Sequence, residues 1–326
     1  LFGVMVLAAF VTASLALSWS DWKAKHNHHF EASEDARRAG IFAANVKTVE
    51  AMNARGSRAR FELNQFAHLS PAEFRSKYLG FKGAAAKGVR RAENREAARV
   101  TAKAPSSYDW RTKTGVLAPV QDQGQCGSCW AFSATCNMES RLAIARGQRV
   151  NKLAEQALVD CEKNCGQYRF FNGCDAGCEG GLQPNAFKFG MSKGMPTEGS
   201  YPYTATDGTC QSFTSVANFT SWEFVSTDET QMQAYVAAHS PISVAVDASN
   251  WQFYSGGIID AGGDVCATQD PNNPSLDHGV TVVGYTADYW IVRNSWAASW
   301  GESGYVRLQM GQDTCGVALF ACSAIP

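Results

Sequence analysis

Residues 123–132, with the sequence QGQCGSCWAF, place Cys126 and Cys129 three positions apart and follow the second cysteine with Trp130. A Cys-x-x-Cys pair can be a redox couple, half of a zinc site, two halves of disulfides, or a nucleophile beside an unrelated disulfide cysteine. Each of these roles needs different partners elsewhere in the chain. Which partners the chain supplies decides the fold and the function.

The composition is that of a globular protein with a secretory start. The chain has 326 residues, of which 45% are hydrophobic and 18% charged, which allows two core-bearing units and excludes a disordered chain or a fibre. Residues 1–18 carry no charge and end in small residues. They predict a truncated secretory signal segment with cleavage near Ala16 or Ser18; a buried N-terminal helix is the alternative. No other stretch is long and apolar enough to span a bilayer, so we expect no stable membrane anchor.

Charge divides the chain into two blocks. Residues 19–103, the basic block, hold 17 Lys and Arg against 9 Asp and Glu, a net charge of +8. Residues 104–326, the acidic block, hold 12 against 21, a net charge of −9. The opposite charges predict that the two blocks dock on each other. A nucleic-acid or membrane arm fits less well, because the basic residues are spread among apolar positions at helical spacing, so we expect no nucleic-acid partner.

All eleven cysteines lie after residue 125, in the acidic block. Behind a secretory start they predict an oxidising compartment and a disulfide framework, and the odd number leaves at least one thiol unpaired. The blocks meet near residue 104. Residues 80–103, just before it, are rich in Ala, Gly and Arg and predict an exposed, cleavable linker.

The spacing of apolar residues predicts an α+β fold. Residues 21–54 have apolar side chains mostly at helical spacing, and residues 129–160 are rich in Ala and Leu, so both stretches predict helical structure. Strand-like runs occur at 242–246, 279–285, 289–296 and 305–308. We expect a helical lobe at about 104–215 and a β-barrel-like lobe at about 216–326, with a cleft between them and a helical segment in front.

A cysteine nucleophile needs a base that takes its proton, a group that orients the base, and donors that stabilise the oxyanion. The acidic block contains only two histidines. His239 precedes Ser-Pro and predicts a surface turn. His278 opens an apolar strand and Asn294 lies at the end of the next one, so these two side chains could form the base and its orienting partner.

Three motifs, QGQCGSCWAF, LDHGV and NSW, stand in this order, and with them the chain resembles the papain-like cysteine peptidases, most of all the cathepsin L-like group. The resemblance implies a papain-like two-lobed domain with Cys129 as the nucleophile and His278 as the base. It implies that Asn294 holds the imidazole and that Trp296 shields their hydrogen bond. Gln123 matches the side-chain donor of the oxyanion hole.

The resemblance extends into the basic block. A propeptide helix motif of the same group is matched at Glu34, Arg38, Phe42, Asn45, Val49 and Asn53. This implies that residues 19–103 are an inhibitory propeptide that lies through the cleft of a peptidase domain at 104–326.

A second propeptide motif, Gly-x-Asn-x-Phe-x-Asp, is only half kept, with Glu62, Asn64, Phe66 and His68 at its positions. His68 therefore stands where an acid is usual. We expect acidification to loosen the propeptide, because carboxylates of the acidic block lose charge while His68 gains a proton. Autoprocessing of His68→Asp measured against pH tests the role of the imidazole.

The resemblance implies three disulfides at family positions: Cys126 with Cys178, Cys161 with Cys210, and Cys266 with Cys315. An insertion at 162–177 holds two further cysteines, which we expect to close a local loop: Cys165 and Cys174. A four-thiolate zinc site is the alternative for Cys161, Cys165, Cys174 and Cys178, but a secretory context favours disulfides. The last two cysteines, Cys136 and Cys322, either pair or stay buried and free.

The resemblance also suggests a substrate cleft. Gly180 and Gly181 resemble a backbone rail that hydrogen-bonds an extended peptide. Four apolar residues map onto the pocket for the P2 residue, the second before the scissile bond: Leu182, Ala245, Leu276 and Phe320. Phe320 lies at the pocket floor, where some relatives have Glu and accept Arg, so we expect a preference for Leu or Val. Gln183 is expected on the lip of this pocket.

The predicted function is that of a secreted or lysosomal cysteine endopeptidase, made as an inactive precursor and acting through a thioester acyl-enzyme. No metal or other cofactor is expected, and the chain is expected to be a monomer. Expected partners are protein and peptide substrates, the chain's own propeptide, and cystatin-type inhibitors. Three alternatives remain: a thiol-disulfide oxidoreductase using Cys126 and Cys129, a catalytically dead binding protein, and a disulfide-stapled structural protein.

Overall fold

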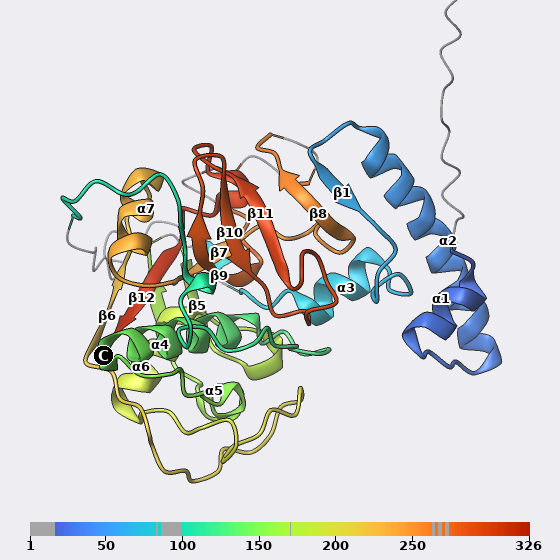
Figure 1. Ribbon diagram of the computed structural model, residues 1–326. Helices are drawn as coiled ribbons and strands as arrows, with labels where there is room; N and C mark the ends of the chain where they lie inside the picture. Colours follow the sequence, from blue (N-terminus) through green and yellow to red (C-terminus); the bar gives the residue numbers. More distant parts are fainter. Residues whose placement is uncertain are drawn as a thin grey trace, which may run out of the picture.

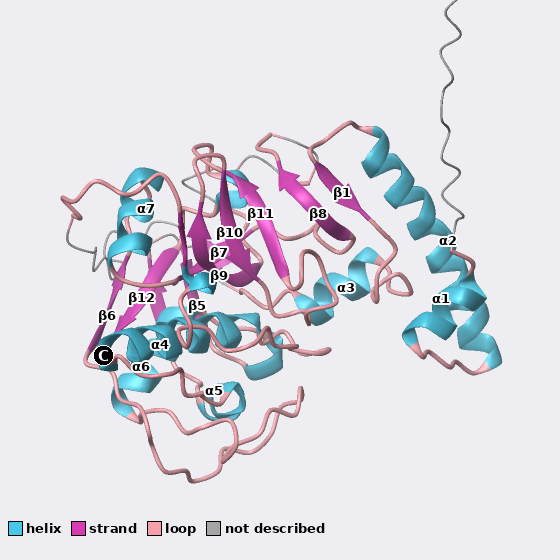
Figure 2. Cartoon of the chain, viewed as in Figure 1, coloured by secondary structure: helices cyan, strands magenta, loops and turns pink. Residues whose placement is uncertain are grey.

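The computed structural model describes residues 17–82, 84–85, 99–169, 171–262, 265–266, 269–270 and 274–326. All but the last two residues of the predicted secretory segment 1–18 lie outside these ranges. The described chain is a mixed α+β structure in which helices flank a large sheet (Figure 1, Figure 2).

The described part of the basic block contains three helices and two short strands: α1 (Trp19–His26), α2 (Ala32–Ala54), β1 (Ala59–Phe61), α3 (Pro71–Tyr78) and β2 (Ala84–Ala85). The helical stretch expected at 21–54 is divided in two, because Asn27 adopts a left-handed conformation (φ 52°) that ends α1. α3 begins with a capping box, in which Ser70 and Glu73 satisfy each other's backbone N–H groups.

The propeptide helix motif lies on one face of α2. Arg38 donates hydrogen bonds to Glu73 and to the carbonyl of His68, each at 2.9 Å. Asn45 donates to two carbonyls of the segment 67–69, also at 2.9 Å. The polar residues of the motif therefore fix the loop that leads into α3.

Nine strands form the large sheet. Eight of them follow the order β1-β8-β11-β10-β9-β7-β12-β6, and β3 pairs with β9 beside this path. The path is open and does not close into a barrel over the described ranges. The strands of the acidic block are β3 (Tyr108–Asp109), β6 (Ser221–Phe224), β7 (Ile242–Val246), β8 (Tyr254–Ile259), β9 (His278–Tyr285), β10 (Tyr289–Arg293), β11 (Tyr305–Gln309) and β12 (Ala321–Ile325).

The four strands expected from the sequence are confirmed as β7, β9, β10 and β11, although β10 ends at Arg293, before the NSW motif. β1 of the basic block forms one edge of the sheet by antiparallel pairing with β8 (Figure 1). The basic block therefore docks on the acidic block partly through backbone hydrogen bonds.

The acidic block also contains four helices: α4 (Cys129–Arg146), α5 (Glu155–Cys161), α6 (Gln183–Ser192) and α7 (Glu229–Ala238). Three short 3-10 helices complete it, at Trp110–Thr112, Gly177–Glu179 and Thr314–Gly316. α4 is buried along most of its length and contacts β7, β9, β12 and α6. Gly147, in a left-handed conformation, ends it.

The described part of the acidic block contributes to two large apolar cores and one small one, and neither large core is a continuous stretch of sequence. Side chains of β6 and β12 share a core with α4 and α6, whereas β3, near the start of the block, joins the large sheet through β9. A separate three-stranded sheet has the order β2-β5-β4, with β2 (Ala84–Ala85), β4 (Cys165–Tyr168) and β5 (Phe171–Cys174).

The acidic block contains four disulfides: Cys126–Cys178, Cys161–Cys210, Cys165–Cys174 and Cys266–Cys315. They are the four pairs expected from the sequence. The sulfurs of the alternative zinc site are therefore all engaged in disulfides, and no group of metal-ligating side chains is found in the part of the chain that the structure describes. Cys129, Cys136 and Cys322 are free thiols and buried.

No helix within the described ranges is long and apolar enough to cross a membrane.

Candidate active site

Cys129 is the first residue of α4, so its thiol lies at the N-terminus of this helix. Two backbone N–H groups donate to its Sγ, that of Gly279 in β9 and that of Gly80 in the basic block, each at 3.3 Å. The dipole of α4 adds positive potential at the same place, which favours a thiolate when the cleft is open. In this structure Cys129 is fully buried.

His278 and Asn294 meet across two neighbouring strands. His278 starts β9, Asn294 follows β10, and the antiparallel pairing of these strands brings the two side chains together. His278 Nε2 lies 2.8 Å from Asn294 Oδ1. The ring of Trp296 stacks on the imidazole with centroids 4.6 Å apart. Among the described residues, His278 Nδ1 has no hydrogen-bond partner, so this nitrogen is available for a proton from another group.

Burial shifts both reactive groups toward their neutral forms. It raises the pKa of the Cys129 thiol to about 12, although the N–H groups of Gly279 and Gly80 oppose the shift. It lowers the pKa of His278 to about 4, opposed by the hydrogen bond that His278 donates to Asn294 Oδ1. Desolvation penalises the charged form of each group. In this covered state both the thiol and the imidazole are neutral near neutral pH.

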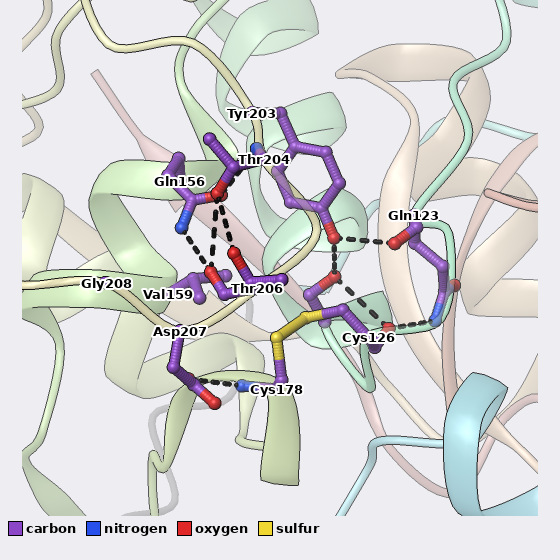
Figure 3. Close-up of a disulfide and its surroundings, with 12 residues drawn as sticks. Gln123, Cys126, Gln156, Val159, Cys178, Tyr203, Thr204, Thr206, Asp207 and Gly208 are labelled. Carbon is purple, nitrogen blue, oxygen red and sulfur yellow. Dashed lines mark hydrogen bonds between the residues drawn. A yellow bond between two sulfur atoms is a disulfide. The ribbon is translucent and has the colours of Figure 1, made fainter.

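Gln123 is held by a hydrogen-bond network next to the disulfide between Cys126 and Cys178 (Figure 3). Its Nε2 donates to the carbonyl of Cys126 at 2.9 Å, and its Oε1 accepts from the Ser295 hydroxyl at 2.7 Å. The Tyr203 hydroxyl donates to the Gln123 carbonyl at 2.7 Å. The disulfide between Cys126 and Cys178 ties the same loop to the segment that follows α5. These contacts give the amide of Gln123 a fixed direction.

The basic block covers Cys129 and Gln123 through the segment that contains Tyr78, Gly80 and Phe81. Gln123 Nε2 also donates to the carbonyl of Tyr78 at 3.1 Å. The Gly80 carbonyl accepts from the N–H of Gly181 at 3.0 Å, and Phe81 forms a parallel bridge with the same glycine. The linker expected to be exposed from residue 80 onward is therefore buried at its start, since Phe81 is only 3% exposed.

Only glycine fits at position 80. A Cβ atom there would lie 1.8 Å from the carbonyl oxygen of Gly127, which is backbone and cannot move aside. The chain of the basic block thus passes in close backbone contact with the loop just before α4.

The expected pocket residues share one apolar cluster, and Phe81 fills it. Leu182, Ala245, Leu276 and Phe320 are all buried in the core that contains Phe81. The rings of Phe81 and Phe320 meet edge to face, with centroids 5.2 Å apart. Trp296 does not belong to this cluster. The rings of three residues of the basic block pack edge-on against it: Phe66, Phe74 and Tyr78.

Two features of the pocket differ from the sequence analysis. Gln183 does not lie on the lip: its side chain is fully buried, and its Nε2 donates to the carbonyl of Val244 at 3.0 Å. Phe171, in the insertion, was not foreseen, yet its ring lies 5.1 Å from Phe81 and 5.4 Å from Phe320. The aromatic content of the insertion, with Tyr168 and Phe171, was the signal that it contributes to a buried surface.

Ion pairs also join the two blocks. Arg58 contacts Asp260 at 2.6 Å and Asp288 at 3.1 Å, and Lys82 contacts Glu179 at 3.2 Å. All three pairs include at least one well-exposed side chain, so each contributes little on its own. Their signs agree with the charge division of the sequence.

The sequence matches two protein families. Residues 104–325 match the family described as papain family cysteine protease, and residues 19–74 match the cathepsin propeptide inhibitor domain. "Cysteine proteinase 1" of Dictyostelium discoideum is 39% identical over 323 residues, which cover 94% of this chain and 91% of that protein.

Solved structures of precursors are similar over the same extent. Digestive procathepsin L 3 of the Tenebrio molitor larval midgut superimposes with a TM-score of 0.81 at 33% identity, covering 94% of this chain and 98% of that one. The recombinant stem bromelain precursor gives a TM-score of 0.78 at 32% identity, covering 94% and 97%. The likeness therefore spans the basic and the acidic block together.

Proposed function

The chain belongs to the papain family of cysteine proteases and carries a cathepsin propeptide inhibitor domain ahead of its protease domain; from this we propose that it is an endopeptidase whose Cys129 attacks peptide bonds and whose residues 19–103 block the cleft until they are removed. The proposed mature protein is 104–326, after loss of a signal at 1–18. The carrying observation is the hydrogen bond between His278 Nε2 and Asn294 Oδ1, which leaves Nδ1 to serve Cys129.

Acylation begins when His278 Nδ1 takes the proton of the Cys129 thiol. The thiolate Sγ forms a bond to the carbonyl carbon of the substrate, and the carbonyl oxygen becomes an oxyanion. Gln123 Nε2 and the backbone N–H of Cys129 donate to that oxyanion. When the intermediate collapses, the C–N bond breaks, the imidazolium gives its proton to the departing amine, and a thioester remains on Cys129.

Deacylation repeats the same transfers with water. His278 takes a proton from a water molecule, whose oxygen attacks the thioester carbon. The C–S bond then breaks, the proton returns to Sγ, and the peptide leaves as a carboxylic acid. Asn294 keeps the imidazole in one orientation through both steps, while Trp296 shields their hydrogen bond from water.

The inhibitory role of the basic block has a simple chemical basis. Gly80 presents its N–H to Sγ, while its carbonyl is engaged with Gly181. The carbonyl that accepts from Gln123 belongs to Tyr78, two residues earlier. Sγ and the oxyanion donor are therefore occupied by different peptide units, so no single carbonyl is placed for attack. Burial also keeps the Cys129 and His278 pair neutral, which suppresses the nucleophile.

The pocket supports a preference for apolar P2 residues. Phe81 of the propeptide occupies it between Phe320 and Phe171, both fully or nearly fully buried. A positively charged P2 side chain would lose its hydration there without gaining a partner. We therefore propose Leu, Val or Phe at P2, with Gly180 and Gly181 binding the main chain. Cystatin-type inhibitors would compete for the same cleft.

Four disulfides favour an oxidising compartment, either extracellular or an acidic, lysosome-like organelle. An acidic compartment would also release the propeptide. His68 is 7% exposed, and its ring lies 4.5 Å from that of His28 and 5.2 Å from that of Trp22. Burial lowers the pKa of His68 to about 4, helped by the charges of His28 and Arg38 and opposed by Glu73.

The sign of this effect favours activation in acid. A histidine freed from the fold titrates near its ordinary pKa of about 6.5. The buried, neutral form of His68 thus stabilises the propeptide fully above pH 6.5, and that stability is lost as the pH falls from about 6.5 to about 4.

A burst experiment tests the proposed chemistry. The processed protein is mixed with an N-acyl-leucyl peptide p-nitrophenyl ester, and p-nitrophenol release and protein mass are followed within one turnover. We expect a burst of one p-nitrophenol per active site and a protein heavier by the acyl group, lost on treatment with hydroxylamine. Steady release without any acylated protein would contradict the thioester route.

A further inference from the structure

The insertion at 162–177 forms a β-hairpin that is closed at its open end by a disulfide. β4 and β5 pair in antiparallel register, with Cys165 opposite Cys174, and these two residues are disulfide-bonded. The hairpin is fixed to α6: Asn185 Nδ2 donates to Asp175 at 2.8 Å, and Tyr168 donates its hydroxyl proton to Asn185 Oδ1 at 2.5 Å. The hairpin is therefore attached to α6 and lies beside Phe81 of the basic block.

The basic block continues from the pocket onto this hairpin. Phe81 contacts Phe171 at the start of β5, and β2 then pairs with β5, with Ala84 opposite Asn172 and Ala85 opposite Phe171. The approach is tight beside Gly173, where a Cβ atom would lie 2.8 Å from the carbonyl oxygen of Lys82. The path thus runs from Sγ of Cys129 through the pocket to the edge of β5.

The outer edge of β5 presents the backbone of Asn172. The Cα atoms of Cys165 and Cys174 are 3.9 Å apart. This is nearer to the about 4.5 Å of an antiparallel pair without hydrogen bonds between its own backbone groups than to the about 5.5 Å of a hydrogen-bonded pair. Asn172 lies two residues before Cys174 in β5, so its backbone groups have the same orientation as those of Cys174. Its N–H and C=O therefore point away from β4 and toward β2. Removal of residues 19–103 would leave these two groups without their strand partner.

We propose that β5 is an outer subsite for substrates, binding by strand addition the residues that lie N-terminal to the P2 residue. The inference rests on the proposed endopeptidase function and deepens it. The occupant is an extended peptide, because the chain's own extended segment already follows this path. A substrate has its N-terminal residues where the propeptide has residues 84–85, so it runs in the opposite direction and pairs with β5 in parallel.

The consequence is a preference for longer peptide substrates. Main-chain hydrogen bonds to Asn172 would favour any peptide that extends at least two residues beyond P2, largely without regard to its side chains. The protease would then bind unfolded polypeptide segments better than short peptides. Phe171 would link the two regions, since it lines the P2 pocket from the strand that forms the outer subsite.

Peptides with the same P2 to P1′ sequence and one to five residues before the scissile bond test the proposal on the processed protein. We expect kcat/KM to rise about tenfold once the P3 and P4 residues are present, on the scale of two net hydrogen bonds. N-methylation of one amide in this segment should abolish the gain. N-methylation of the adjacent amide, whose N–H points the other way, is the matched control and should preserve it.

A variant examines the protein side of the same contact. Asn172→Pro removes the outward N–H, and we expect the ratio of kcat/KM for long over short peptides to fall toward one. A long-to-short ratio near one in the unmodified protease, or equal effects of the two N-methyl groups, would overturn the strand-addition proposal. Failure to cleave any of the peptides would instead contradict the proposed function. The N-methyl series decides the matter if Asn172→Pro does not fold.

Discussion

Burial acts on the two reactive side chains in opposite directions. The pKa of Cys129 rises to about 12 and the pKa of His278 falls to about 4, because both charged forms are disfavoured away from water. Part of the cover is the propeptide itself, through Gly80 at the thiol. Its departure would bring the two pKa values toward each other, and a proton could then move from sulfur to imidazole.

The orienting role of Asn294 is testable by one substitution. Asn294→Ala removes the only acceptor that the described residues offer to His278 Nε2, and the imidazole can then rotate away from Cys129. We expect kcat to fall by about 10² with KM little changed, since small misplacements of a reacting group have effects of this size. A kcat within twofold of the unmodified enzyme would remove Asn294 from the mechanism.

The side chain of Phe320, at the proposed floor of the P2 pocket, should decide which P2 residues the protease accepts. Phe320→Glu places a carboxylate between the positions of Phe171 and Phe224, where an Arg side chain at P2 would be its natural counter-charge. The ratio of kcat/KM for P2 Leu over P2 Arg should fall at least about tenfold. Phe320→Gln, similar in size but uncharged, is the matched control and should lower activity toward both peptides. An unchanged ratio in Phe320→Glu would show that P2 lies elsewhere.

The residues proposed for catalysis could be predicted from the sequence because each lies in a short motif whose geometry is local. Gln123 and Cys129 share one loop, and His278 and Asn294 lie at the ends of consecutive strands. Phe171 could not be predicted in this way. Its direction depends on how the insertion hairpin docks on α6, which no local pattern encodes, and the buried position of Gln183 was missed for the same reason.

Among the elements, α2 holds α3 and the loop before it in place within the propeptide. Arg38 lies on its buried face and donates to Glu73, to Glu34 and to the carbonyl of His68, so it joins α2, α3 and the loop between them. Arg37, one position away, also pairs with Glu34 and Glu73 but from the solvent side. The two arginines have the same acidic partners and differ mainly in burial.

This pair supplies a matched stability test in the Cys129→Ser precursor, which cannot process itself under the proposed mechanism. Arg38→Ala should lower the free energy of unfolding of the propeptide by about 2 kcal/mol, because it removes the buried donor of the His68 carbonyl and one of the donors of the partly buried Glu73 carboxylate. Arg37→Ala should have little effect. Both are measured by urea unfolding followed by tryptophan fluorescence, and equal losses would contradict the assigned role of burial.

Element boundaries were less predictable than element types. The break between α1 and α2 depends on the left-handed conformation of Asn27, and apolar spacing alone does not reveal it. The start of the linker was misjudged because Gly80 and Phe81 lie in a stretch dominated by Ala, Gly and Arg. They are buried because they pack against residues that are distant in the sequence: Gly80 against Gly127, and Phe81 against Phe320.

Across the whole molecule, acid should separate the two blocks. His28, His68 and Arg38 lie together in the propeptide, so protonation of the imidazoles adds positive charges that repel one another there. Glu73, whose pKa is held near 2 although burial opposes it, stays charged throughout the range in which the histidines titrate. Loss of propeptide stability therefore tracks the imidazoles between about pH 6.5 and 4.

Replacing the imidazole tests this switch. His68→Gln stays uncharged at every pH, so its autoprocessing at pH 5 should slow severalfold and depend less steeply on pH than that of the unmodified precursor. His29→Gln, on an exposed neighbouring position, is the control and should leave the profile unchanged. The His68→Asp variant places at position 68 the acid that is usual in this propeptide motif. If the pH profile of autoprocessing in both His68 variants equals that of the unmodified precursor and of His29→Gln, His68 has no part in activation.

The central claim is that Cys129 alone carries the reaction and that the propeptide withholds it. Its most direct test is labelling with a peptidyl epoxide that has Leu at P2, followed by peptide mass spectrometry of three free thiols: Cys129, Cys136 and Cys322. We predict one label, on Cys129, in the processed protein, and none in the intact precursor or in Cys129→Ser. Labelling that persists in Cys129→Ser after its residues 19–103 are removed by added unmodified enzyme, or labelling that falls on Cys136 or Cys322, would contradict the claim.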